Sequence, residues 1–385
     1  RCGMSTVLRT DTSIVGRWWW TVDRWLMVMI GGLIFAGVVL TLAASPAVAE
    51  RIGLDTYHFA IRQLIFLPLG VVVMLLVSLL APRSVRRLAL LITGGAMVLM
   101  VGTLIFGMEI KGATRWIRFG GLALQPSEFV KPGFAVVAAW LFAQRRLDDR
   151  FPGYLLATGL YILIIALLAL QPDIGMALVV SAVWGIQFFL AGLPLIIVVG
   201  LGVLFLGGSV SAYFLFDHVN ARINRFIDPA AGEGYQVTRA LEALKSGGLF
   251  GRGPGEGHVK EVLPDAHADF ILAVAGEEFG LIVCLILVML FACIVLRGMS
   301  RAYKGDDLFV LLAVAGLMVQ FALQAIINMA STLNMMPPKG MTLPFISYGG
   351  SSTLAIAIGM GMVLALTRIM PGGGAVSGPV GRRHS

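Results

Sequence analysis

Long apolar blocks separated by short polar connections run through the chain. The block from Leu26 to Val48 is one example, and the block from Leu193 to Phe216 is another. Crossing about 30 Å of hydrocarbon takes roughly 20 helical residues. Lipid offers no hydrogen-bond partner for backbone N–H and C=O groups. The blocks also lack the alternation of apolar and polar residues that is typical of barrel strands. The pattern predicts membrane-spanning helices at roughly 26–48, 59–81, 88–108, 129–143, 153–170, 175–190, 193–216, 269–296, 309–330 and 352–370.

Composition supports this interpretation. Of the 385 residues, 58% are hydrophobic and 13% are charged, whereas soluble domains are about half apolar and about a quarter charged. We therefore expect an all-α polytopic membrane protein with about ten transmembrane helices and a large outer loop between helices seven and eight.

The net charge of +8 could indicate nucleic-acid binding, but the positions of the basic residues indicate topology instead. If both termini lie on one side, that side receives most of the basic connections. An excess of Lys and Arg marks the cytoplasmic side, so we predict cytoplasmic termini and no nucleic-acid partner. The connections concerned carry Arg83, Arg86, Arg87, Arg145, Arg146, Arg150, Arg297, Arg301 and Lys304.

The predicted organisation is a cytoplasmic tail (1–25), a membrane domain (26–370) and a disordered cytoplasmic tail (371–385). The periplasmic loop at 217–268 is long for a connection, and such loops are usually functional or disordered. Helical spacing at 234–245 predicts a short amphipathic helix at the membrane surface. The glycine-rich stretch at 246–257 that follows is either a flexible hinge or a shaped segment.

The loop entering the fourth helix carries the first candidate site residues, in KGATRWIR at 111–118 and QPSEFVK at 125–131. Glu128 and Lys131 are three residues apart, so they can pair on one helix face. They are either a neutralised pair that seats the helix end or the wall of a pocket. In the second case Lys131 and Arg115 would meet an anionic ligand. Trp116 is either an interfacial anchor or a substrate platform.

Acidic residues precede the eighth helix. Asp269 is followed at once by an apolar run, so partial desolvation should raise its pKa and suit it to general-base work. The alternative is that Asp269 caps the helix. Glu261 and Asp265 lie earlier in the loop, and Glu277, two turns on, could line the same cavity.

A proline- and glycine-rich segment at 334–352 precedes the last helix. It supplies donors suited to a phosphate or a sugar, namely Lys339, Thr342, Ser347, Tyr348 and Ser351. Asp173 lies in a tight outer turn, either as a turn residue or as a helix cap. GRGPGEG at 251–257 lacks the spacing of a dinucleotide fingerprint, and His258 and His267 lack further ligands at zinc-site spacing.

Taken together, the motifs resemble the SEDS family (shape, elongation, division and sporulation) of bacterial wall polymerases, which contains RodA and FtsW. The segments KGMTLPFISYGG at 339–350 and GRGPGEG resemble the division branch, FtsW, more than RodA. The motifs that carry the resemblance are GATRWI at 112–117, QPSEFVK at 125–131, QPDIG at 171–175, GYQ at 234–236, LPDAHADF at 263–270 and LPFISYGGSS at 343–352.

The resemblance implies a ten-helix fold and polymerisation of lipid II into β-1,4 glycan strands on the outer leaflet. It implies that Asp269 is the catalytic carboxylate and that Glu261, Lys131 and Trp116 occupy functional positions. Ala123 departs from relatives that carry arginine there, which puts a basic role at that position in doubt.

In this chemistry Asp269 would deprotonate the acceptor 4-hydroxyl. Arg115, Lys131 and Lys339 would stabilise the departing pyrophosphate. A divalent cation, Mg²⁺ or Mn²⁺, is an open addition to that role.

Two alternatives are a lipid II flippase and a non-enzymatic scaffold of the division machinery. Transporters tend to show paired repeats and interrupted helices at mid-membrane, and the sequence shows no repeat. Because no serine lies in an S-x-x-K arrangement, cross-linking would need a partner. We predict a class B penicillin-binding protein (a transpeptidase), together with other divisome membrane proteins, at the division septum.

Overall fold

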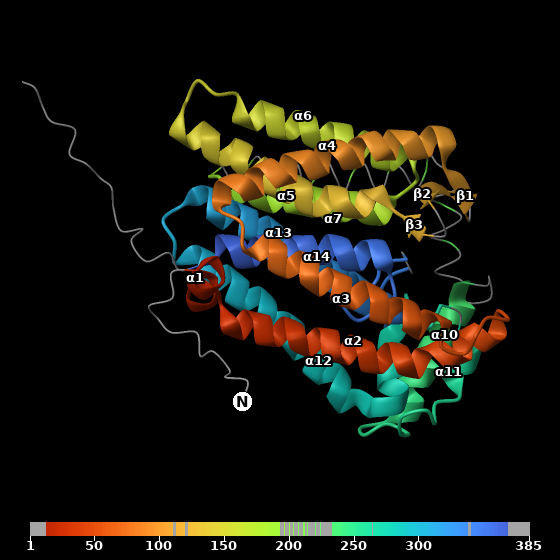
Figure 1. Cartoon of the computed structure of the whole chain (residues 1–385). Helices are drawn as coiled ribbons and strands as arrows, with labels where there is room; N and C mark the ends of the chain where they lie inside the picture. The colour runs from red at the N-terminus through yellow and green to blue at the C-terminus, as the bar shows by residue number, and fades with distance from the viewer. Residues whose placement is uncertain are drawn as a thin grey trace, which may run out of the picture.

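The computed structural model describes residues 13–110, 113–119, 122–192, 233–263, 265–337 and 340–368, with isolated positions between 196 and 224. Helices dominate these residues, and their axes run side by side in a bundle (Figure 1). Nine described helices match predicted spans, whereas the predicted seventh span at 193–216 lies outside the continuously described residues. The nine are α2 (Arg24–Arg51), α3 (His58–Ser78), α4 (Pro82–Phe106), α5 (Pro126–Leu147), α6 (Gly153–Leu170), α7 (Ile174–Leu190), α12 (Ile271–Tyr303), α13 (Leu308–Thr332) and α14 (Gly350–Leu366).

Length and composition allow six of the described helices to cross a membrane: α2, α3, α4, α6, α12 and α13. The apolar helices α7 and α14 are shorter. The sides of α5 and α14 are almost wholly buried, which places these two helices in the core. Large apolar side chains such as Phe35, Leu91 and Leu155 are exposed on outer helices, as expected for surfaces that face lipid. The polytopic membrane fold is therefore confirmed.

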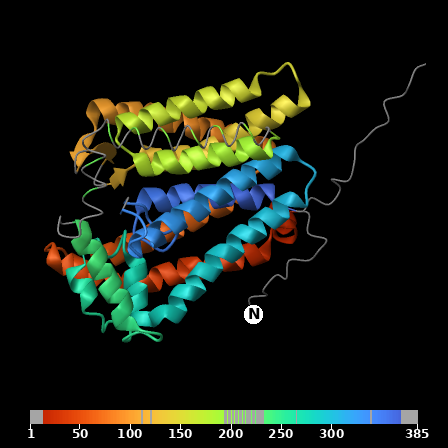
Figure 2. The same ribbon diagram turned by 180° about the vertical axis from the view of Figure 1, so that it is seen from behind.

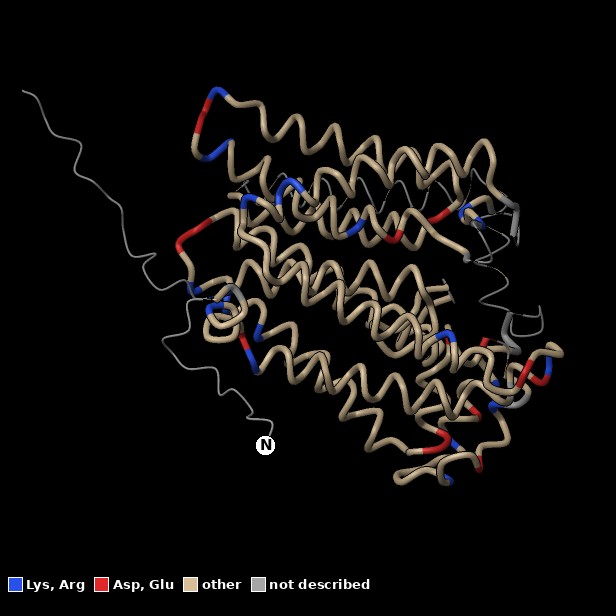
Figure 3. The backbone as a smooth tube through the Cα atoms, in the orientation of Figure 1, with Lys and Arg blue, Asp and Glu red and all other residues tan. Residues whose placement is uncertain are grey.

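Polar contacts define the two ends of the bundle. At one end Trp18 Nε1 donates to Ser78 Oγ at 2.9 Å, and Arg368 Nη2 donates to the carbonyl of Leu80 at 2.7 Å. These bonds bring the first described helix, α1 (Ile14–Thr21), and the end of α14 to the same end. The small sheet, α10 (Glu233–Gly247) and α11 (Val259–Val262) lie at the opposite end, as both views show (Figures 1 and 2). Most charged residues gather at these two ends (Figure 3).

Helix α1 and the small sheet were not expected from the sequence. Helix α1 lies within the predicted N-terminal tail, where Ser13 Oγ accepts the N–H of Gly16 at 2.9 Å and caps it. The loop before α5 forms a three-stranded antiparallel sheet in the order β1-β2-β3, with Met108 opposite Trp116 and Ile117 opposite Leu124. The strands are β1 (Met108–Ile110), β2 (Ala113–Phe119) and β3 (Leu122–Leu124).

Helix α12 is broken near its start, at Gly280, whose φ of 81° lies in the left-handed region. The glycine-rich loop fills the break. Leu281 N donates to the carbonyl of Gly248 at 3.0 Å, and Arg252 N donates to the carbonyl of Glu277 at 2.9 Å. Such close backbone approach requires glycine, since a Cβ on Gly280 would lie 2.4 Å from the carbonyl oxygen of Leu249. The stretch at 246–257 is thus a shaped segment hydrogen-bonded to α12.

The predicted short helix at 234–245 is confirmed as α10. Its apolar stripe packs against α12, where Leu244 fills the space beside Gly276. This contact fixes α10 to α12, the helix that follows Asp269.

Candidate active site

A cavity of about 310 Å³ opens at the end of the bundle that carries the sheet. Residues from five separate parts of the chain line it, which is typical of a site assembled by a membrane bundle. The chemically informative ones are Arg62 of α3, Trp116 of β2, Glu128 of α5, His267 and Asp269 of the segment before α12, and Tyr348 of the segment before α14.

Asp269 lies in a tight turn just before α12. The N–H groups of Ala268 and Asp269 both donate to the carbonyl of Asp265 at 3.0 Å, and Asp265 itself adopts a φ of 52°. Phe270, not Asp269, occupies the N-cap position of α12. The alternative that Asp269 caps the helix is therefore not supported. The turn leaves the Asp269 side chain partly exposed to the cavity.

Asn328 of α13 holds this turn against the segment before α14. Its Nδ2 atom donates to the carbonyl of Asp269 at 2.9 Å and to the carbonyl of Met341 at 2.7 Å. A Cβ placed on Gly340 would lie 3.9 Å from Asp269 Oδ2. The segment before α14 therefore approaches the Asp269 carboxylate at Gly340, a residue without a side chain.

His267, two residues before Asp269, is packed in an aromatic stack. Its ring lies 4.0 Å from that of Phe59, centroid to centroid, and Tyr348 N donates to the His267 carbonyl at 3.0 Å. Burial lowers the pKa of His267 to about 4, although Asp265 opposes the shift. The imidazole is therefore neutral at pH 7.

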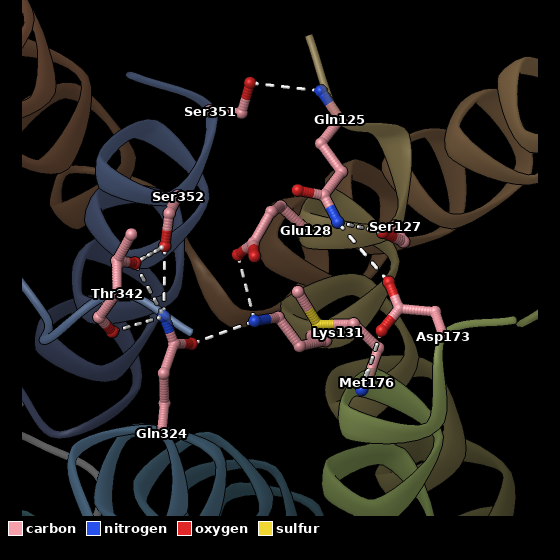
Figure 4. A network of polar contacts seen from close by, with 10 residues as sticks. All are labelled: Gln125, Ser127, Glu128, Lys131, Asp173, Met176, Gln324, Thr342, Ser351 and Ser352. Carbon is pink, nitrogen blue, oxygen red and sulfur yellow. Dashed lines mark hydrogen bonds and ion pairs between the residues drawn. The ribbon is translucent and has the colours of Figure 1, made fainter. Parts of the chain in front are cut away.

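Glu128 and Lys131 form the ion pair predicted from the sequence, with Oε2 and Nζ 2.9 Å apart and both side chains buried. Lys131 Nζ also donates to Gln324 Oε1 at 2.8 Å. Gln324 in turn donates to the Thr342 carbonyl and to Ser352 Oγ, so the pair joins α5 to α13 and α14 (Figure 4). Glu128 lines the cavity, whereas Lys131 lies behind it.

Arg115 differs from the sequence-based expectation. Its guanidinium donates to the carbonyls of Gln171 and Pro172, and Nη1 lies 3.7 Å from Asp173 Oδ1. Arg115 is not among the residues that line the cavity, because these acceptors hold it against the turn before α7. Asp173 is confirmed as a helix cap, since its Oδ1 accepts the N–H of Met176 at 3.3 Å.

The sequence left open that Glu277 lines the same cavity as Asp269, but it is not among the residues that line it. Its carboxylate is fully buried and accepts the N–H groups of His258, Val259 and Lys260 at 2.7 to 3.0 Å. Glu278 forms an ion pair with Lys260. The two carboxylates therefore fix α11, which leads into the turn that carries Asp269.

The other predicted residues have varied outcomes. Ser347 is buried and does not line the cavity, because its Oγ accepts the N–H of Leu343 at 2.8 Å and shapes the loop. Lys339 lies outside the described residues, as does the side chain of Glu261. Arg62 was missed, although an arginine inside a predicted span is itself a signal, since such residues usually face an interior or a water-filled cavity.

Metal coordination finds no support in the described part of the chain. No group of three or more His, Cys, Asp or Glu residues there could hold an ion. We derive no step through the divalent cation considered from the sequence.

Comparisons with known proteins give further evidence. Residues 24–370 match the family model FtsW/RodA/SpoVE, described as cell cycle protein. A protein of Caulobacter vibrioides named probable peptidoglycan glycosyltransferase FtsW is 48% identical, covering 97% of this chain and 96% of the relative. A protein of the same name from Trichlorobacter lovleyi is 37% identical, covering 90% of this chain and 93% of the relative.

Solved structures agree with the sequence relatives. The rod shape determining protein RodA of Thermus thermophilus is 28% identical, with a TM-score of 0.66 over 91% of this chain and 97% of that one. A chain from a structure on the coordination of polymerization and crosslinking by a peptidoglycan synthase complex is 27% identical. Its TM-score is 0.74, over 90% of this chain and 97% of that one.

The bundle and its terminal cavity define a polytopic membrane protein with a polar site at one end of its helices. The chain belongs to the FtsW/RodA/SpoVE family of cell cycle proteins, and its relatives place it in the FtsW branch. The resemblance to the SEDS family seen in the motifs is thereby confirmed.

Proposed function

We propose that this protein is a peptidoglycan glycosyltransferase that polymerises lipid II into β-1,4 glycan strands during septal wall synthesis. The observation that carries the proposal is the placement of Asp269 in a cavity at the end of a membrane bundle. The relatives named probable peptidoglycan glycosyltransferase support the reaction class. Transport and scaffolding alone explain the cavity less well, because neither needs a carboxylate at this point.

In the proposed reaction Asp269 accepts the proton of the acceptor's 4-hydroxyl. The oxygen attacks C1 of the donor sugar as the bond from C1 to the pyrophosphate oxygen breaks, and the electron pair leaves with the lipid pyrophosphate. One displacement inverts an α-linked donor to a β-linked product. Asn328 and the turn at 265–269 orient the base, which is the positioning that such catalysis requires.

The remaining residues support this arrangement. Glu128 faces the cavity while Lys131 neutralises it from behind. Trp116 lines the same cavity and offers a flat apolar surface for a sugar ring. Glu261 and Lys339 remain candidate substrate-binding residues.

The proposed setting is the inner membrane at the division septum. Residues 1–25 and 371–385 would be cytoplasmic tails of the domain at 26–370, and 217–268 would be periplasmic. A class B penicillin-binding protein and other divisome proteins are the proposed partners. The neighbouring structure described as a peptidoglycan synthase complex supports a partner of this kind.

Incubating the purified protein with labelled lipid II, with and without the transpeptidase, tests the proposal. Glycan polymers resolved by electrophoresis are the expected product. Lipid II crossing the bilayer of proteoliposomes without polymer formation would support a flippase instead. The absence of both polymer formation and lipid II transport, together with retained binding of the transpeptidase, would support a scaffold.

A further inference from the structure

Three arginines gather around one carboxylate at the end of the bundle that carries α1. Asp23, the N-cap residue of α2, is only 3% exposed. Arg297 Nε donates to Asp23 Oδ1 at 3.0 Å, and Arg301 Nε donates to Asp23 Oδ2 at 2.7 Å. Arg24 follows Asp23 directly and has no carboxylate partner within the described part of the chain. One carboxylate thus meets three guanidinium groups, which leaves two positive charges of the cluster unbalanced.

The cluster lies where the apolar parts of α2 and α12 end. The apolar run of α2 starts at Leu26, just after Arg24, and the apolar run of α12 stops at Leu296, just before Arg297. The ion pairs with Asp23 hold these two helix ends together. The guanidinium groups therefore lie at the border of the hydrocarbon layer, which is the depth of the lipid head groups.

Two of these arginines keep donors for a further ligand. The side chains of Arg297 and Arg301 are 32% and 28% exposed. Their hydrogen bonds to Asp23 come from the Nε atoms. The Nη1 atom of Arg297 and both Nη atoms of Arg301 have no acceptor among the residues that the structure describes. Because the planar fork of an arginine matches the oxygens of a phosphate, the pair can bind one while it still holds Asp23.

Helix α1 adds tryptophans beside the arginines, and Figure 1 shows it next to the start of α2. The Arg24 guanidinium carbon lies 5.2 Å from the ring centroid of Trp19 and 4.8 Å from that of Trp20. Such cation–π contacts hold the guanidinium in place without neutralising it. Trp25 and Val28 at the start of α2 are exposed, and tryptophan is enriched at the head-group level of membranes. The arginines therefore border a surface suited to lipid chains.

We propose that Arg24, Arg297 and Arg301 form a binding site for cardiolipin, an anionic phospholipid with two phosphates. The two unbalanced positive charges match its two phosphodiester groups, and basic pockets between membrane helices on the cytoplasmic side bind such head groups. The acyl chains lie along Trp25 and Val28. The bound lipid ties α1 and α2 to α12. The site is at the opposite end of the bundle from the Asp269 cavity, so it does not depend on the proposed polymerase function.

Native mass spectrometry of the purified protein in detergent, with added cardiolipin, measures the affinity. The parent should bind one cardiolipin about tenfold or more tightly than phosphatidylcholine, which has no net charge. Arg24→Gln should weaken cardiolipin binding about tenfold, because it removes a charge-assisted contact with phosphate. The matched control Arg150→Gln removes an exposed arginine from the connection between α5 and α6, at the same end of the bundle. It should bind cardiolipin like the parent.

Arg301→Lys is a second variant that keeps a cation beside Asp23 and removes the planar fork. It should bind cardiolipin more weakly than the parent while its thermal midpoint without added lipid stays close to the parent's. Equal affinity of the parent for cardiolipin and phosphatidylcholine would overturn the site, because that result indicates an annular lipid only. Parent-like cardiolipin binding by Arg24→Gln, or equal weakening by Arg150→Gln, would overturn it too.

Discussion

The Oε1 atom of Glu277 accepts a hydrogen bond of 2.7 Å from the backbone N–H of Val259. The same carboxylate also accepts the N–H groups of the two neighbouring residues, His258 and Lys260. The side chain of Glu277 in α12 thus caps α11, although eighteen residues of chain separate Glu277 from Val259. This contact fixes the start of the segment that ends at Asp269.

Glu277→Ala should therefore destabilise the protein by roughly 2–4 kcal/mol, because three backbone donors lose a charged acceptor. Thermal unfolding in detergent measures the effect. Glu256→Ala, which removes an exposed carboxylate of the neighbouring loop, should stay within about 0.5 kcal/mol of the parent. Equal midpoints for the two variants would show that the Glu277 contact is not structural.

Gly280→Ala should disrupt the outer loop. Residue 280 has a φ of 81°, and a Cβ there would lie 2.4 Å from backbone atoms of Leu249 and Gly251. Limited proteolysis should cut the 246–257 segment faster than in the parent. Gly159→Ala is the matched control, since a Cβ on this helical glycine meets nothing within 4 Å and alanine favours helix. Unchanged protease resistance of Gly280→Ala would contradict the close backbone packing between the 246–257 segment and α12.

The Glu128–Lys131 pair should behave as a coupled unit. Lys131→Met leaves a buried carboxylate without its cation, which should cost about 3–5 kcal/mol. Adding Glu128→Gln should recover part of that loss, because the orphaned charge is gone. A double-mutant cycle on thermal stability measures the coupling. Strictly additive effects would mean that the two side chains do not interact.

Because burial lowers the pKa of His267, we predict that the stability of the protein depends on pH. Its folded pKa of about 4 lies below the ordinary value of 6.5 because the ring is buried. Between these values the unfolded chain binds a proton that the folded chain does not. Stability should fall as pH drops from 6.5 towards 4, by up to about 3 kcal/mol.

His267→Phe should flatten this part of the stability profile, while His258→Gln at an exposed position should leave it unchanged. Thermal midpoints at half-unit pH steps provide the measurement. A parental slope in His267→Phe would assign the pH dependence to other groups.

The hydrophobic blocks predicted nine of the described helices because membrane helices must satisfy their backbone internally. The break at Gly280 escaped prediction, since the loop 30 residues earlier that fills it is not adjacent in sequence. Arg115 and Lys131 were predicted to bind an anionic ligand, from their residue type and their position near the membrane border. Their partners, the carbonyls of 171–172 and the side chain of Gln324, come from distant parts of the chain. Spacing along one segment cannot reveal such partners.

Topology can be tested at Glu256, which is exposed in the loop predicted to be periplasmic. Glu256→Cys, in a background without the native cysteines, should react with a membrane-impermeant maleimide in intact spheroplasts. The positive-inside distribution is the physical reason. Labelling only after lysis would place the cavity on the cytoplasmic side and exclude the proposed reaction.

Polymerisation of lipid II by Asp269→Asn tests the general base most directly. Asparagine keeps the size of the side chain and removes its ability to accept a proton. The variant should fold with a parental thermal midpoint, and its polymerisation rate should fall by roughly 100-fold or more. A folded Asp269→Asn protein that polymerises lipid II at near the parental rate would contradict the assignment and make Glu261 the next candidate.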